Sequence, residues 1–210
     1  MAFYQRNLPH WQPTNAEFFI TFRLAGSLPK QAINMLRAYR KELKEKKEKD
    51  HNHQISRNVF QKYEHLLDTA ATGPIWLKKK EIAQTVQNAL HYHDEQSYDL
   101  YAFTIMYNHV HLVFRHLTYA NKNEKLGNKY PVTDILHSIK SYTALECNKI
   151  LDRKGRFWQS ESYDRVIRNK DELEKTIWYT LNNPVKAGFV DQWQEWAYSY
   201  CTPKFMDTFK

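Results

Sequence analysis

The sequence predicts an α+β fold with an antiparallel sheet. Some short segments alternate apolar residues in steps of two, which is typical of half-buried strands, and longer segments repeat them every three or four positions, as helices do. Along the chain these segments follow the order strand, helix, two helices, strand, strand, helix, strand, helix. Only Tyr107 and Asn108 separate the two middle strands, which favours a tight antiparallel hairpin.

The first strand is expected within residues 16–25, where Phe18, Ile20, Phe22 and Leu24 recur at period two. A helix follows Leu28-Pro29, because proline is tolerated in a first helical turn. This helix runs into a charged segment, residues 37–49, with seven basic and three acidic side chains. We interpret the segment as a solvated helix end, and a phosphate-contacting arm is the alternative.

The remaining elements continue the same alternation between helical and strand patterns. A polar loop rich in Asn, Lys and Gly precedes the helix expected at 132–150, and Pro184 ends the helix expected at 171–182. No internal repeat or linker is visible, so we expect one domain over 1–210, with a helical insertion at about 50–95 and a tail from about 191. The expected elements are helices at 56–69 and 78–91, strands at 98–106 and 109–115, a helix at 132–150, a strand at 162–168 and a helix at 171–182.

Composition narrows the class of protein. The 210 residues carry a net charge of +8, which favours a polyanionic partner. Two cysteines form neither a disulfide framework nor a CxxC pair, so a reducing compartment is expected. No apolar run approaches the roughly 20 residues of a membrane span, and the N-terminus lacks the apolar region of a secretion signal.

Three His-x-His triplets occur, at His51/His53, His91/His93 and His109/His111. On a strand, residues two apart point to the same face, so that two imidazoles can bind one metal ion. On a helix they lie about 200° apart and do so poorly. His109/His111 is the triplet in a strand-like apolar segment, although an isolated pair of this kind is more often a packed or surface pair.

Two nitrogens hold a divalent ion weakly, so a third ligand is needed. Tyr179 and Asn183 are four apart and share one helix face, and Pro184 leaves Asn183 at the helix end. Imidazole with amide oxygen suits Mn²⁺ or Mg²⁺ better than structural zinc. By itself, Tyr179 is one of fourteen tyrosines, most of which serve packing.

Several segments together resemble a known family. MYNHVHLVF contains the His-hydrophobic-His motif, and residues 157–190 contain FWQSESYDRVIRNKDELEKTIWYTLNNPVKAGFV. With LPHWQPTNAEFFITFRLAGSLP, GPIWLKKKEIAQTVQNAL and SIKSYTALECNK, they resemble the REP-associated tyrosine transposases, a branch of the single-tyrosine HUH transposases. The resemblance covers about Leu8 to Val190. It departs at Tyr107, where the family usually has proline.

The resemblance implies a ferredoxin-like α/β sandwich with the histidines on a central strand and the tyrosine on a packed helix. His109, His111 and Asn183 would bind Mg²⁺ or Mn²⁺, and Tyr179 would be the nucleophile. The implied activity is metal-dependent cleavage and rejoining of hairpin-bearing single-stranded DNA through a 5′-phosphotyrosine intermediate. The implied setting is the bacterial cytoplasm at the nucleoid, without membrane association, as a monomer or a homodimer.

Substrate binding would combine basic side chains with aromatic stacking on unpaired bases. Each candidate also has a plainer interpretation, either core packing or a surface ion pair. The candidates beside the motif block are Lys140, Trp158, Gln159, Tyr163, Arg165 and Arg168.

Two rival functions remain open. A domesticated protein could bind hairpins without cutting them, although it would need neither the histidines nor Tyr179. A zinc hydrolase could use the histidine pair, but no glutamate stands near that pair in the sequence.

Overall fold

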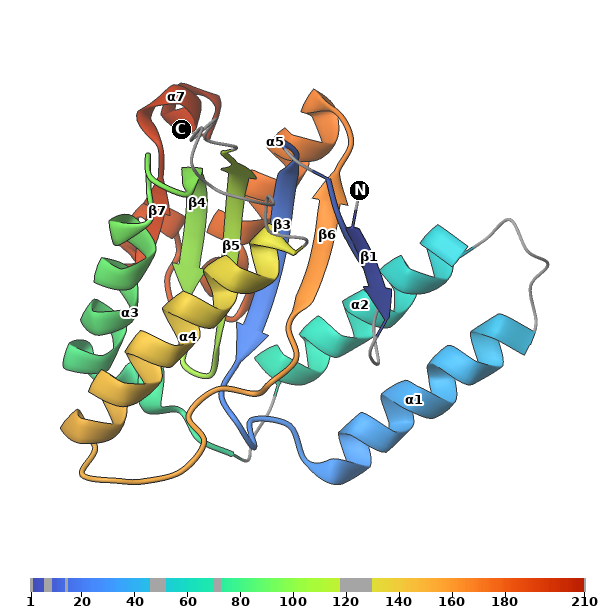
Figure 1. Cartoon of the computed structure of the whole chain (residues 1–210), viewed down its shortest axis with the longest axis horizontal. Helices are drawn as coiled ribbons and strands as arrows, with labels where there is room; N and C mark the ends of the chain where they lie inside the picture. Colours follow the sequence, from blue (N-terminus) through green and yellow to red (C-terminus); the bar gives the residue numbers. More distant parts are fainter. Residues whose placement is uncertain are drawn as a thin grey trace.

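The computed structural model describes residues 2–5, 9–13, 15–45, 52–69, 73–117 and 130–209. Its centre is an antiparallel five-stranded sheet in the order β6-β3-β5-β4-β7 (Figure 1). The strands are β3 Glu17–Arg23, β4 Tyr98–Ile105, β5 His109–His116, β6 Tyr163–Ile167 and β7 Ser199–Cys201. A separate hairpin pairs β1 Ala2–Gln5 with β2 Pro9–Gln12.

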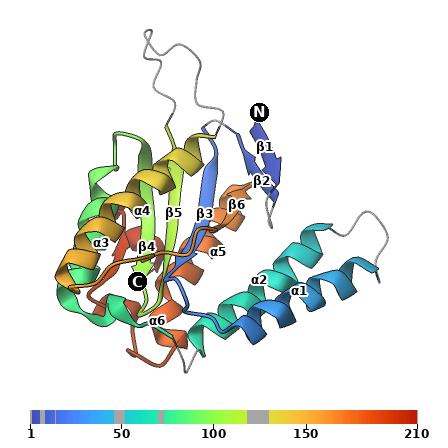
Figure 2. The same cartoon turned by 60° about the horizontal axis from the view of Figure 1, so that its bottom comes forward.

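Helices cover both faces of this sheet. The helices α3 Lys80–Tyr92 and α4 Pro131–Ile150 cover one face, and α5 Lys170–Leu181 covers the other. The helices α1 Lys30–Glu45 and α2 Asn52–Asp68 lie side by side as an antiparallel pair that projects from the sheet (Figure 2). The short helices are α6 Asn183–Lys186 and α7 Pro203–Met206, with 3-10 turns at Trp76–Lys78, Trp193–Glu195 and Asp207–Phe209.

Strand alternation sorts residues between the two faces. On β3, Phe18 and Phe22 join the core cluster under α3 and α4, whereas Phe19 joins the cluster under α5. On β5, Leu112 belongs to the α3/α4 side. Because neighbouring residues point in opposite directions, His111 faces the α5 side, directly opposite Thr21 of β3. The central strands therefore place the histidine pair under α5.

The predicted α+β class with an antiparallel sheet is confirmed. The predicted strands and helices are present, with ends shifted by a few residues. Strict alternation fails in β4, where the register shifts between Leu100 and Ala102. This bulge places both Tyr101 and Ala102 in the cluster under α5. The helix expected at 171–182 is α5, which ends at Leu181. Asn183 therefore begins the separate helix α6 instead of ending α5.

Three strands, β1, β2 and β7, have no counterpart in the sequence analysis. They are only three or four residues long, too short for an alternating pattern to be recognised. Among the described residues, no helix is both long and apolar enough to cross a membrane.

Candidate active site

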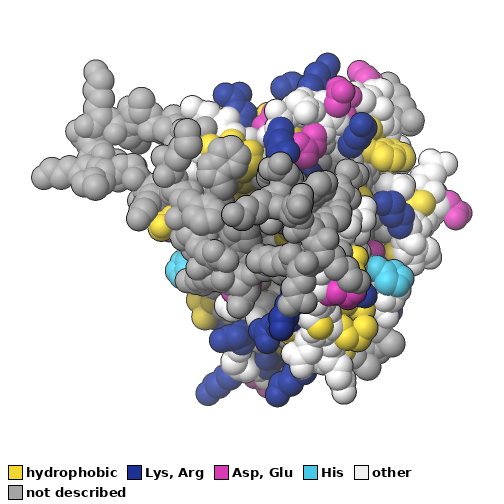
Figure 3. All heavy atoms as spheres, turned by 90° about the vertical axis from the view of Figure 1, so that its right-hand side faces the viewer, with side chains coloured by type: hydrophobic (Ala, Val, Ile, Leu, Met, Phe, Trp, Pro, Cys, Tyr) yellow, Lys and Arg dark blue, Asp and Glu magenta, His cyan; other side chains and the backbone are white. Residues whose placement is uncertain are grey.

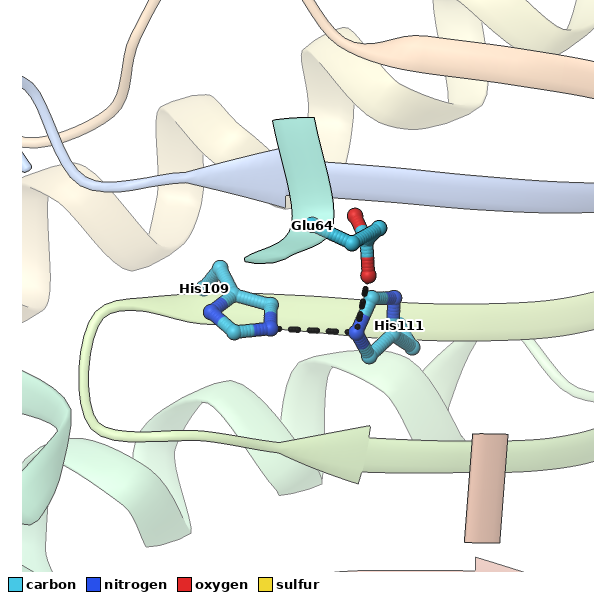
Figure 4. Close-up of side chains that lie close together, drawn as sticks. All are labelled: Glu64, His109 and His111. Atoms are coloured by element: carbon cyan, nitrogen blue, oxygen red, sulfur yellow. Dashed lines mark hydrogen bonds and ion pairs between the residues drawn. The ribbon is translucent and has the colours of Figure 1, made fainter. Parts of the chain in front are cut away.

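The two histidines of β5 meet at their Nε2 atoms. His109 and His111 are both almost fully buried, and their Nε2 atoms lie 3.0 Å apart (Figure 4). His109 Nδ1 lies 2.6 Å from Asn108 Oδ1, and His111 Nδ1 lies 2.9 Å from Thr21 Oγ1. These contacts orient both rings, as the hydrogen-bonding partners of metal-binding histidines do. Burial and the neighbouring imidazole hold the pKa of His109 well below its usual value, so this ring is neutral.

A carboxylate from α2 completes this cluster. Glu64 Oε2 lies 3.0 Å from His111 Nε2 and accepts a hydrogen bond of 2.7 Å from the Tyr179 hydroxyl. Possible ligand atoms of Glu64 and the two histidines all lie within 4.8 Å of one another. Figure 4 shows the Glu64 side chain pointing from its helix toward the two rings. The sequence analysis did not identify Glu64.

Asp68 lies one helical turn after Glu64, at the edge of the same site. Its Oδ1 atom is 3.8 Å from His109 Nε2, and its side chain is 24% exposed. Burial, followed by the charge of Glu64, raises the pKa of Asp68 to about 6. The spacing of four residues places both carboxylates on one face of α2.

Tyr179 enters the site from α5. The side chain of Asn169 caps this helix by accepting from the Glu172 N–H at 2.9 Å. The Tyr179 ring lies edge-on to Phe19, with ring centres 5.9 Å apart, and the Lys186 Nζ atom lies 4.3 Å from its centre. Burial and then the charge of Glu64 raise the pKa of Tyr179, so the phenol is protonated in this arrangement.

Asn183 is 1% exposed at the start of α6. Neither polar atom of its side chain has a well-formed hydrogen bond within the described part of the chain, and neither does Glu64 Oε1. A buried polar atom without a partner costs about 1–3 kcal/mol. Because Glu64 lies beside two imidazoles, its unpartnered oxygen indicates a ligand position, and the nitrogen and oxygen donors there fit a divalent cation.

The DNA-binding candidates Lys140, Trp158 and Gln159 lie away from the histidines. Trp158 belongs to the core under α3 and α4, where its indole N–H donates to Thr143 Oγ1 at 2.8 Å. Lys140 donates to the Gln159 carbonyl at 3.0 Å, and burial lowers its pKa to about 8. Gln159 itself donates its backbone N–H to the Arg23 carbonyl. Their role in DNA binding stays a prediction.

Tyr163, Arg165 and Arg168 come from β6 and the residue that follows it. The Tyr163 ring stacks on Phe60 of α2 with ring centres 4.1 Å apart. The Phe60 ring in turn lies 6.4 Å from the Tyr179 ring, centre to centre. Arg165 forms an ion pair with Glu172. Arg168 is exposed. Tyr163 and Arg165 both contact the Phe19 ring, at 6.4 and 5.8 Å, and Phe19 in turn lies edge-on to Tyr179.

The described triplet His91/His93 does not form a comparable pair. His91 packs edge-on to Phe103, whereas His93 contacts Ser97 and Ser138 through its two nitrogens. His51 and the side chain of His53 lie outside the described residues.

Known proteins with a similar sequence or fold include REP-associated tyrosine transposases. No family model matches the chain. Over 103 residues it is 26% identical to a REP-associated tyrosine transposase of Haemophilus influenzae, a match that covers 49% of this chain and 58% of that protein. The chain thus matches less than two thirds of that relative's length.

A solved structure of a REP-associated tyrosine transposase bound to a REP hairpin shares the fold. The TM-score is 0.54, and the match covers 95% of this chain and 82% of the other at 16% identity. At this identity the likeness concerns the fold. The chain therefore resembles the REP-associated tyrosine transposases in sequence over about half of its length and in fold over nearly all of it.

Proposed function

We propose that this chain is a metal-dependent endonuclease and strand transferase for hairpin-bearing single-stranded DNA, with Tyr179 as nucleophile. One observation carries the proposal. A tyrosine hydroxyl, two imidazoles and a carboxylate meet in one cluster, with Glu64 Oε2 2.7 Å from Tyr179 Oη and 3.0 Å from His111 Nε2. The resemblance to transposases, one of them bound to a REP hairpin, supports the substrate class. We further propose that residues 1–210 act as one domain.

The reaction would be a transesterification. The Tyr179 oxygen attacks the phosphorus, a new phosphotyrosine bond forms, and the bond to the 3′-oxygen breaks. The phenol releases one proton and the leaving 3′-oxygen takes one up. The phosphodiester energy is retained in the 5′-phosphotyrosine, so that the reverse attack by a 3′-hydroxyl rejoins DNA without ATP.

The residues of the pocket have separate tasks. His109, His111 and Asn183 would hold Mg²⁺ or Mn²⁺. When bound, such a cation supplies charge stabilisation and orientation at the phosphate. Asn108 fixes the His109 ring, as described above. The Lys186 ammonium, 4.3 Å from the Tyr179 ring centre, stabilises the negative charge that develops on the phenol.

Basic side chains suit a polyanionic strand. Lys and Arg side chains are visible at several places on the side of the molecule that carries α1 and α2 (Figure 3). On α1, Lys30, Arg37 and Lys41 are exposed. Arg37 and Lys41 belong to the charged segment of residues 37–49, whose end at 46–49 lies outside the described residues. We propose that these cations and the candidate residues Lys140, Gln159, Tyr163, Arg165 and Arg168 contact DNA phosphates and unpaired bases, while Trp158, 5% exposed, supports them from the core.

A gel assay for a covalent adduct tests the nucleophile. Hairpin-bearing single-stranded DNA, labelled at its 5′ or its 3′ end, is incubated with protein and Mn²⁺ or Mg²⁺ and separated under denaturing conditions. We expect a slowly migrating adduct that carries only the 3′ label, and we expect Tyr179→Phe to abolish it. The control Tyr142→Phe changes a tyrosine that is 55% exposed on α4 and should leave the adduct intact. An adduct that persists in Tyr179→Phe would place the nucleophile elsewhere.

A hairpin-binding protein without catalysis is the second candidate. It is favoured by the Tyr179 hydroxyl, which is protonated and donates a hydrogen bond to Glu64. This candidate predicts tight, salt-dependent binding of the same DNA and no adduct with any divalent cation.

A further inference from the structure

We propose that α2 is a displaceable cover over the active site, and that the Glu64 carboxylate occupies the position of the scissile phosphate. In this closed state the cover prevents cleavage, and DNA enters only when α2 moves away. The inference rests on the proposed function, because it concerns entry of DNA into that same pocket.

The contacts of Glu64 are those that a reacting phosphate needs. A near-attack arrangement places the phosphorus about 3–3.5 Å from the nucleophilic oxygen. Glu64 Oε2 instead lies 2.7 Å from Tyr179 Oη and 3.0 Å from His111 Nε2. A carboxylate is, like phosphate, an anion with more than one acceptor oxygen. The two groups therefore compete for one place between the nucleophile and the histidines.

The closed pocket leaves no space for a DNA strand. His109, His111 and Asn183 are at most 1% exposed, and the Glu64 side chain is 5% exposed. Asp68 adds a second carboxylate 3.8 Å from His109 Nε2. Two carboxylates one turn apart repel an incoming phosphate at this short range. Entry of DNA thus requires both acidic groups of α2 to leave together.

Aromatic, apolar and polar contacts hold α2 on the body of the molecule, with Leu67 1% exposed and Glu64 bonded to Tyr179 and His111. Phe60 stacks on Tyr163 and lies edge-on to Phe19, with ring centres 4.1 and 5.5 Å apart. The Leu67 carbonyl accepts from Asn108 Nδ2 at 3.0 Å. On its other side α2 packs against α1, and both helices project from the sheet (Figure 2). The pair can therefore separate from the body while the sheet core stays intact.

Two glycines lie where this helical pair joins the body. Gly26 precedes α1 and Gly73 follows α2, with φ angles of 81° and 104°. Their backbones are in contact, because a Cβ atom on Gly73 would lie 2.7 Å from the Gly26 carbonyl oxygen. Positive φ angles are accessible to glycine without strain, so these positions suit a hinge.

Binding and cleavage assays test the cover. Glu64→Ala removes the carboxylate, and Phe60→Ala weakens docking of α2 without changing a charge. Apparent affinity scales with the fraction of open protein, so if about a tenth is open, full opening raises it about tenfold. We expect both variants to bind hairpin-bearing DNA about tenfold more tightly in EDTA. With Mn²⁺ and subsaturating DNA, both should form the adduct faster than the unmodified protein.

The exposed residue Gln61 provides a matched control on the same helix, and Gln61→Ala should change neither quantity. If Glu64→Ala forms the adduct more slowly than the unmodified protein, Glu64 is a required member of the site and the proposal is overturned. Unchanged DNA affinity in both variants overturns it as well. Absence of the adduct in every protein, with higher affinity in both variants, would reject strand transfer and retain the cover.

Hydrogen exchange tests the cover without DNA. Local opening exchanges the amides of a segment at a free energy below that of global unfolding. We expect amides of residues 58–68 in α2 to exchange through such an opening, and those of residues 82–90 in α3 to exchange only through global unfolding. Exchange of both helices at the same free energy would overturn the proposal even if no protein bound DNA.

Discussion

The two faces of the central sheet are built from alternate residues of the same strands, yet they differ in what they bury. The face under α3 and α4 is packed with apolar side chains around Phe18 and Leu112. The face under α5 has its own apolar cluster, but polar side chains are buried beside it. On β3, β4 and β5 they are Thr21, Arg23, Thr104, His109 and His111.

This difference separates stability from chemistry within one sheet. Burial of apolar surface stabilises the fold by roughly 25 cal/mol per Å², whereas burial of polar groups costs free energy unless they are paired. Neighbouring residues such as His111 and Leu112 therefore have opposite tasks, although they share one strand. Predictions that compare the two faces test this division.

The largest effect on stability is expected from Leu112→Ala. Leu112 is fully buried under α3 and α4, and such truncations cost about 2–5 kcal/mol because a cavity remains. Denaturant unfolding measures the change in the free energy of unfolding. Leu145→Ala, at a side chain that is 58% exposed on α4, should change it by no more than about 0.5 kcal/mol. Equal effects of the two variants would contradict the assignment of this face to stability.

The second largest effect concerns metal binding on the opposite face. A ligand that binds only the folded protein stabilises it by about 2.7 kcal/mol at 100 times its Kd. We expect Mn²⁺ to raise the Tm of the unmodified protein and to leave that of His111→Gln unchanged. His137→Gln, an exposed position on α4, should respond like the unmodified protein. A metal-dependent Tm in His111→Gln would show that the ion binds elsewhere.

The elements that form this sheet were predictable because their signals are local. Alternation in residues 16–25 predicted β3, and the histidine spacing on a strand predicted that both rings face one side. The Tyr179 ring lies 5.8 Å from the His111 ring, centre to centre, and the roles of Tyr179 and Asn183 stay predictions. The bulge at Tyr101 was not predictable from alternation, because a register shift depends on pairing with β5.

Glu64 is the member of the cluster that could not be identified from the sequence. A helix at 56–69 was predicted, but its tertiary contacts were not. Glu64 lies 45 positions before His109 in the sequence, and the two meet only because α2 returns to the sheet. A weak signal was present, since Glu64 and Asp68 are acidic and four apart on one helix face. Such a pair is usually solvated, so it did not distinguish a site from a surface.

The third prediction concerns Lys186 on the α5 side. A cation over an aromatic ring contributes about 0.5–2 kcal/mol, and here it opposes the charge that develops on Tyr179. We expect Lys186→Gln to slow adduct formation by about 3–30-fold with little change in unfolding free energy. Lys186→Arg should retain most of the rate, and Lys175→Gln, at an exposed position of α5, should retain all of it. A rate in Lys186→Arg as low as in Lys186→Gln would indicate a role other than charge.

The smallest effect is expected from His116, a buried polar residue on the same face of β5 as Leu112. Its Nδ1 atom has no hydrogen-bonding partner within the described part of the chain, and burial lowers its pKa below the usual value. Below about pH 6.5 the unfolded chain therefore binds more protons at His116 than the folded protein does, and the free energy of unfolding falls on acidification.

Replacement by leucine removes this proton uptake. We expect denaturant unfolding between pH 7.5 and 5.5 to show a flatter pH dependence for His116→Leu than for the unmodified protein, so that the difference between them grows as pH falls. The exposed His137→Leu should leave the pH dependence unchanged. Parallel curves for His116→Leu and the unmodified protein would mean that His116 gains a proton as readily in the folded state. The α3/α4 face would then admit water near β5, and the division between a dry face and a polar one would not extend to the end of the strand.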